Sequence, residues 1–198
     1  MSQMYRVEIK ESVRATRRLR DRVVYDLALT PLLDPQEMLD LLRQELVADG
    51  FVDEGGRCSR VEADAGEGAG EVRVAVDLEA RSVEITLERD VTITTEVTLQ
   101  ERGDADREPN RDRARERLRA ASQDLIEREV NEALRAPQEA LTAELEGRLD
   151  AHRRALNGPL QRVYAEALKR KARQMGDVVE QRESTQGGVY ELLIKITQ

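Results

Sequence analysis

The chain has 198 residues, of which 36% are charged, 39% are hydrophobic and 3% are aromatic, and its formal net charge is −8. This length allows one or two small domains with a buried core. The negative charge argues against general binding to nucleic acid or to anionic membranes. One histidine, one cysteine and no tryptophan leave few side chains suited to catalysis.

Cysteine use and hydropathy bear on the compartment. Cys58 is the single cysteine, so no disulfide can form within the chain, as is typical of a reducing compartment. The first residues hold no apolar segment of the secretory kind, and no apolar stretch approaches the length of a membrane span. We therefore expect a cytoplasmic protein with no membrane contact.

Two strands are predicted near the N-terminus because apolar and polar residues alternate there. The first contains Tyr5, Val7 and Ile9, and the second covers residues 23–29. We expect the arginine-rich segment between them, residues 11–21, to be a loop or the irregular end of a hairpin.

A helix is predicted over residues 35–49. The run Asp34-Pro35-Gln36-Glu37 forms a capping box, with aspartate at the N-cap, proline at the first helical position and glutamate three residues after the cap. Gly50 is placed to end the helix. Apolar residues recur at helical spacing between these ends: Met38, Leu41, Leu42 and Leu46.

The middle of the chain predicts an antiparallel sheet. A strand near residues 58–61 is followed by a glycine-rich acidic loop and a strand over residues 72–78. A two-residue turn at Ala80-Arg81 would place Leu78 opposite Val83. From residue 83 to residue 99 the apolar side chains all have odd numbers. This pattern fits either one long strand that bends near residues 89–90 or two strands joined there by a three-residue loop.

The second half of the chain is predicted to be helical up to a final hairpin. Residues 102–110 are charged and read as a linker. Helical spacing begins near residue 111, Pro137 interrupts it and Asn157-Gly158-Pro159 ends it. A further helix over residues 160–175 precedes strands at 178–183 and 189–196, joined by a turn at 186–188.

The predicted fold class is α+β. We expect an antiparallel sheet domain with one capped helix over residues 1–101 and the charged linker over 102–110. A helical arm with a C-terminal helix and β-hairpin follows over residues 111–198.

A concentration of arginines is the one candidate anion-binding site, because guanidinium forks match phosphate oxygens. The segment lacks interleaved aromatic residues for base stacking, so we favour a solvated or ion-pairing segment and keep polyanion binding as the alternative. The candidate residues are Arg14, Arg17, Arg18, Arg20 and Arg22.

No other motif predicts a catalytic residue, a metal or a cofactor. Cys58 and His152 lack the spacing of a zinc site, although a pairing of the two in space stays open. The alternating glycines of residues 66–70 do not form a phosphate-binding loop. An acidic loop is the remaining candidate for a metal, but its spacing does not match an EF-hand: Glu62, Asp64, Glu67 and Glu71.

The helical arm carries a candidate protein-interaction stripe. Leu141, Leu145 and Leu149 follow one another at four-residue intervals on a helix whose other faces are charged. Two interpretations stay open. Either the arm folds back and these leucines join the core, or they form a coiled-coil-like surface for a partner or a second copy.

Several stretches of the chain resemble an accessory domain of the FtsH ternary systems, which are bacterial gene clusters that encode a AAA+ ATPase with small uncharacterised proteins. The resemblance carries no catalytic motif. The stretches are Tyr5-Arg6-Val7-Glu8-Ile9, residues 21–27, Leu32-Leu33-Asp34-Pro35, and residues 45–51, 71–78 and 82–85. The ending, residues 165–172 and 176–180 and Tyr190-Glu191-Leu192-Leu193-Ile194-Lys195, also looks like the helix-plus-hairpin tail of proteins found near such ATPases.

The resemblance implies a non-catalytic subunit or adaptor that works with a AAA+ ATPase in conflict or stress, through protein–protein contacts. The chain has no P-loop lysine of its own, in keeping with hydrolysis by the partner. The alternative is a module that binds nucleic acid or another polyanion through residues 14–22. A metal-dependent enzyme that uses the acidic loop is a third, weaker possibility.

Overall fold

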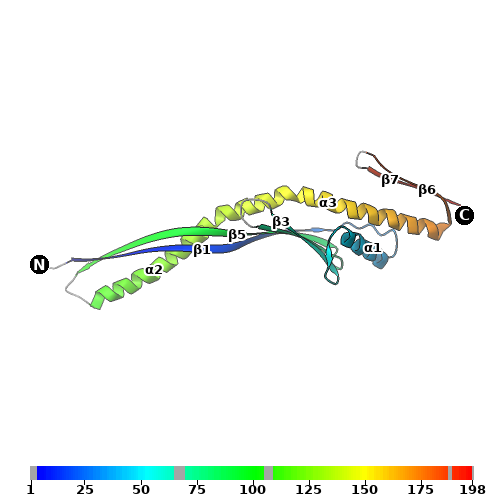
Figure 1. Ribbon diagram of the computed structural model, residues 1–198. Coiled ribbons are helices and arrows are strands. Elements are labelled where there is room, and N and C mark those ends of the chain that lie inside the picture. The colour runs from blue at the N-terminus through cyan, green and yellow to red at the C-terminus, as the bar shows by residue number, and fades with distance from the viewer. Residues whose placement is uncertain (1–3, 65–69, 105–108, 187–188, 198) are drawn as a thin grey trace. The chain divides into compact units, whose positions relative to one another are not determined.

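The computed structural model describes residues 4–64, 70–104, 109–186 and 189–197, and it confirms an α+β fold (Figure 1). A five-stranded antiparallel sheet has the strand order β1-β5-β4-β3-β2, and β6 and β7 form a separate two-stranded sheet. The elements in chain order are β1 (Met4–Asp26), α1 (Pro35–Ala48), β2 (Val52–Asp53), β3 (Arg57–Asp64), β4 (Gly70–Asp77), β5 (Ser82–Asp104), α2 (Pro109–Ala133), α3 (Arg135–Met175), β6 (Asp177–Gln186) and β7 (Val189–Thr197).

The chain divides into two compact units, each built from segments distant in sequence. Unit 1 comprises Met1–Asp21, Ala65–Gly70 and Glu88–Ala143, and unit 2 comprises Arg22–Asp64, Glu71–Leu87 and Glu144–Gln198. The predicted domain boundary at residues 102–110 stays a prediction. Strand β5 extends to Asp104 and α2 begins at Pro109, and residues 105–108 lie outside the described part of the chain.

Helix α1 is confirmed, and its ends are capped by the residues that the sequence singles out. The Asp34 carboxylate accepts a hydrogen bond of 2.9 Å from the backbone N–H of Gln36. At the other end, the N–H of Gly50 donates to the carbonyl of Val47 (3.1 Å) and the N–H of Phe51 donates to that of Leu46 (3.0 Å). This pair of bonds is a Schellman motif, and Gly50 has the positive φ (+89°) that the motif requires.

The loop predicted at residues 11–21 is wrong, because β1 runs through it as one strand of 23 residues. Odd-numbered side chains continue the inward face through this segment: Val13 and Ala15 pack against a hydrophobic cluster and Leu19 is buried. Arg14 and Arg18 occupy the other face, where charge is readily solvated, whereas Arg17 has the parity of the inward face and is nevertheless exposed. Because arginines are so abundant in residues 11–21, the alternation of inward and outward side chains is hard to recognise in the sequence.

The long odd-numbered pattern is one strand, β5, also of 23 residues, so the first of the two interpretations holds. The turn before it is longer than the two residues predicted, since residues 78–81 all lie outside the flanking strands. Arg81 has a positive φ (+50°), and the N–H of Ala80 donates to the Asp77 carboxylate at 2.7 Å. Strand β2 has only two residues, which is too short to leave a sequence pattern.

The predicted helix end at Asn157-Gly158-Pro159 is wrong, because α3 continues through Pro159 to Met175. Proline removes one helical hydrogen bond, yet here its ring is buried. Leu156 and Val163 are buried on either side of it, so packing holds the helix together across the interruption. The interruption predicted at Pro137 is confirmed, because α2 ends at Ala133 and α3 begins at Arg135. This places Pro137 in the first turn of α3, where a proline is tolerated.

The C-terminal hairpin is confirmed. Strands β6 and β7 pair antiparallel from Asp177 opposite Thr197 to Gln186 opposite Val189, with an irregularity between Val178 and Glu180. Of the turn predicted at residues 186–188, Gln186 is the last residue of β6, and residues 187 and 188 lie outside the described residues.

Each unit has its own buried side chains. In unit 1, Val97 of β5 packs with Ile126 and Val130 of α2, and Val13 of β1 lies against them. Unit 2 buries the apolar face of α1 and side chains of β4 and the start of β5. Neighbouring residues of β4, from Val74 to Val76, are all buried. Because successive strand residues point to opposite faces, both faces of the sheet are covered there.

Candidate functional site

A cleft of about 570 Å³ in unit 2 is the candidate site. Its walls come from the second half of α1, the C-terminal half of α3 and the β6–β7 hairpin. Gly158 lies in the wall, and a Cβ at this position would lie 3.6 Å from a terminal nitrogen of Arg162. Three cations and three carboxylates line the cleft and balance in charge: Arg162, Lys169, Arg170, Glu45, Glu166 and Glu183.

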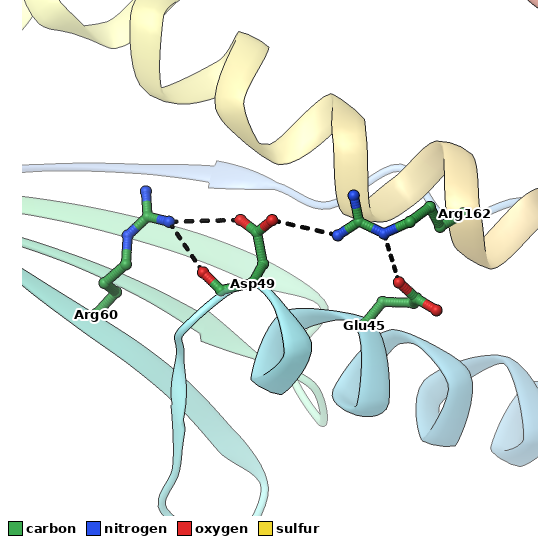
Figure 2. A network of polar contacts seen from close by, with 4 residues as sticks. All are labelled: Glu45, Asp49, Arg60 and Arg162. Carbon is green, nitrogen blue, oxygen red and sulfur yellow. Dashed lines mark hydrogen bonds and ion pairs between the residues drawn. The ribbon is translucent and has the colours of Figure 1, made fainter.

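Arg162 ties α3 to the C-terminal end of α1 (Figure 2). Its Nε donates to Glu45 at 2.5 Å, and its terminal nitrogen donates to Asp49 at 3.2 Å. Arg60 of β3 approaches the same Asp49 from the other side, at 3.4 Å from the carboxylate and 3.3 Å from the backbone carbonyl. The Arg60 guanidinium also lies 4.8 Å from the centre of the Phe51 ring. Asp49 therefore joins α1, β3 and α3, and both arginines oppose the negative end of the α1 dipole.

Lys169 connects α3 to the hairpin. Its ammonium lies 2.6 Å from the Glu183 carboxylate, which also accepts a hydrogen bond of 2.8 Å from the Tyr190 hydroxyl. The hydrogen bonds from Lys169, Tyr190 and Gln181 lower the pKa of Glu183 from 4.5 to about 2. Loss of solvent, together with the bond to Glu183, raises the pKa of Tyr190.

These shifts bear on what the cleft can do. A general acid or base works best when its pKa lies near the working pH. Glu183 instead stays ionised and Tyr190 stays protonated throughout the neutral range, because their pKa values move away from neutrality in opposite directions. Arg170 is likewise paired, at 3.2 Å from Glu166. The arrangement suits recognition of a polar segment by ion pairs and hydrogen bonds better than proton transfer.

Cys58 and His152 lie in different electrostatic surroundings. Burial raises the pKa of the Cys58 thiol, and the negative charges of Asp53 and Glu54 act in the same direction. Burial lowers the pKa of His152, against the opposing effect of Glu62. The thiol is thus protonated and the imidazole neutral near pH 7, which is the reverse of an activated thiolate–imidazolium pair.

Residues 1–197 match the family described as FtsH ternary system domain X5. The chain belongs to this family. The match confirms the resemblance drawn from the sequence and connects the chain to a multi-component system. No curated protein and no solved structure matches the chain.

The arginine segment of this X5 domain lies on β1. Arg14, Arg18 and Arg20 of unit 1 are exposed side chains of even number, whereas Arg17 has the other parity. Arg18 and Arg20 both pair with Glu88 of β5, at 2.8 and 3.4 Å. Arg22 belongs to unit 2 and is also exposed. The contacts with Glu88 are those of an ion-pairing segment, and anion binding stays a prediction.

The three leucines of the arm differ in exposure. Leu141 of unit 1 and Leu145 of unit 2 are each 1% exposed, and Leu149 of unit 2 is half-buried. Burial of the first two agrees with the interpretation in which the arm folds back. A role of the stripe in partner binding stays a prediction, since it would require another conformation.

The acidic loop offers no metal site in the part of the chain that the structure describes. Glu62 pairs with Arg60 at 2.8 Å and Glu71 lies 3.7 Å from Arg73. Glu67 and the side chain of Asp64 lie outside the described residues. Within residues 4–64, 70–104, 109–186 and 189–197, no group of three or more histidine, cysteine or acidic residues is placed to hold a metal ion. No helix within those ranges is long and apolar enough to cross a membrane.

Sequence reasoning missed the cleft. Arg162, Lys169 and Glu183 are ordinary charged residues in a chain where such residues are abundant. No local pattern specifies the contact of Arg162 with Glu45, or the pairing of Lys169 on a helix with Glu183 on a strand. Tyr190, the one aromatic residue of β7, was the one available signal.

Proposed function

We propose that this X5 domain is a non-catalytic subunit or adaptor of a bacterial conflict or stress system in the cytoplasm, and that it works with a AAA+ ATPase through protein–protein contacts. Family membership over residues 1–197 carries the proposal, because it connects the whole chain to a multi-component system named after an ATPase. ATP hydrolysis then belongs to the partner.

The chemistry of the unit 2 cleft supports a recognition role. Its ionisable groups are paired, and Glu183 and Tyr190 do not exchange protons near neutrality. Its charges balance, and Arg170 remains 42% exposed beside Glu166. A polar segment of the ATPase that carries both signs of charge can exchange ion pairs with such a surface. We therefore assign the ATPase contact to this cleft.

The test mixes the purified X5 domain with the ATPase encoded beside it and measures the mass of the complex by light scattering after size exclusion. We expect a complex of fixed stoichiometry, and ATP turnover only where the ATPase is present. Arg170→Glu reverses a charge in the cleft and should weaken the complex. Arg128→Glu makes the same change at an exposed position of α2 and is the matched control.

Three outcomes separate the parts of this proposal. Absence of any complex contradicts the adaptor role, and ATP turnover by the X5 domain alone contradicts its non-catalytic nature. If Arg170→Glu and Arg128→Glu form the complex equally well, the adaptor role stands, but the ATPase does not bind at the cleft.

A polyanion-binding module is the second candidate, because Arg14, Arg18 and Arg20 share the exposed face of β1. The pairing of Arg18 and Arg20 with Glu88 disfavours it. We expect no retention on heparin at physiological salt. Binding that weakens steeply with salt and disappears when Arg17, Arg18 and Arg20 are all changed to alanine would favour this candidate over the adaptor.

A further inference from the structure

The C-terminal hairpin is held to its unit by polar contacts, such as the Lys169–Glu183 ion pair, more than by buried apolar side chains. Strands β6 and β7 form a sheet of two strands, and such a hairpin is marginally stable by itself in water. Within residues 177–184 and 190–197, where side chains are described, none is buried. The hairpin nevertheless contains several aliphatic residues, of which Val179 and Leu193 are among the most exposed in the chain.

The two faces of β7 differ in character. Tyr190, Leu192, Ile194 and Ile196 share one face and are half-buried. Glu191, Leu193 and Lys195 alternate with them on the opposite, exposed face, and Leu193 is 51% exposed. On one side β7 pairs with β6, while its other edge is an end of the two-stranded sheet. An end strand presents backbone N–H and C=O groups that can pair with a further strand.

The order of residues in β7 suits pairing with itself. An antiparallel partner centred on Leu193 places Leu192 opposite Ile194, Glu191 opposite Lys195 and Tyr190 opposite Ile196. Each of these apolar side chains lies opposite an apolar one, and each charge lies opposite the opposite charge. Because the contact is symmetric, every one of these pairs occurs twice. A strand without a basic residue opposite Glu191 and an acidic residue opposite Lys195 would leave these charges unmatched, and a second copy supplies both.

We propose that this protein self-associates through β7, with the β7 strands of two copies pairing antiparallel about Leu193 to form a four-stranded sheet (hairpin at the end of α3 in Figure 1). The half-buried aliphatic faces of the two hairpins then become continuous, which gives the sheet the apolar face that two strands alone cannot supply. Lys195 already pairs with Glu180 across the hairpin, so in the dimer it lies between two carboxylates. This contact is independent of any ATPase.

Charge reversal at the proposed contact tests the register. Glu191→Lys and Lys195→Glu each place like charges opposite one another in the dimer, and each should weaken self-association by about tenfold or more in sedimentation equilibrium of the full chain. The double variant restores opposite charges between the copies and should recover part of the association, because a glutamate at position 195 still lies beside Glu180 within the hairpin. Arg182→Glu is the control. It reverses an exposed charge of the same hairpin, but it lies on β6 and not on the strand that pairs between the copies.

Disulfide cross-linking tests the same register without the charge variants, so it can be used even if one of them is poorly folded. The two-fold axis brings Leu193 of one copy against Leu193 of the other, so Leu193→Cys should form an intermolecular disulfide on treatment with diamide. Lys195→Cys should not, because residue 195 faces residue 191. The native Cys58 is buried and does not compete. A monomeric wild-type chain overturns the proposal, as does equal association of all charge variants or equal cross-linking at positions 193 and 195.

Discussion

Leu145→Asp should remove a large part of the stability of unit 2. The side chain of Leu145 is 1% exposed on α3. Truncation of a buried leucine to alanine costs about 2–5 kcal/mol, and an aspartate adds the cost of a carboxyl group without a partner in an apolar site. Together these effects should lower the free energy of unfolding by about 4 kcal/mol or more, whereas a typical domain has a free energy of unfolding of roughly 5–15 kcal/mol. Urea denaturation followed by circular dichroism measures the loss directly.

Leu168→Asp is the matched control, because Leu168 lies on the same helix and is 41% exposed. We expect this change to cost about 1 kcal/mol or less. If Leu145→Asp shifts the midpoint no more than Leu168→Asp does, then Leu145 is not part of the core and the arm does not fold back. Loss of self-association by a well-folded Leu145→Asp variant would instead favour the docking interpretation of the stripe.

Three further outcomes are expected. Asp34→Ala removes the acceptor for the Gln36 N–H and should lower the free energy of unfolding by about 1 kcal/mol, so an unchanged urea midpoint would contradict the cap. The carboxyl carbon of Glu183 should titrate in NMR with a midpoint of about 2, and in a Lys169→Met variant the midpoint should move toward 4.5. Because this pKa is lowered, the stability contributed by Glu183 is present above pH 4.5 and is lost as the pH falls toward 2; a wild-type midpoint near 4.5 would contradict the contact. Cys58 should react with a thiol reagent far more slowly in the native protein than in urea, and equal rates would contradict its burial.

The parts of the fold that the sequence predicts are those governed by local chemistry. The Asp34 cap and the Gly50 stop define α1 because both act through neighbouring backbone groups. The same holds for the period-two patterns of β4 and β5 and for the final hairpin, where alternation alone identifies the side chains that share a face.

The errors occurred where tertiary packing decides the outcome. Arginines 14–22 suggest a loop by composition, but Val13, Ala15 and Leu19 on the other face keep β1 continuous. Pro159 suggests a helix end, but its burial within α3 outweighs the lost hydrogen bond. The cleft could not be predicted for a related reason. Contacts such as that of Arg162 with Glu45 join residues more than a hundred positions apart, and no local pattern specifies them.

Calorimetric titration of the X5 domain into the ATPase encoded beside it tests the proposed function most directly. The account predicts saturable heat with a fixed stoichiometry, and weaker binding for Arg170→Glu than for Arg128→Glu. Absence of any binding heat at several temperatures, with both proteins shown to be folded and the ATPase active, would contradict the claim that this chain is a subunit working with that enzyme.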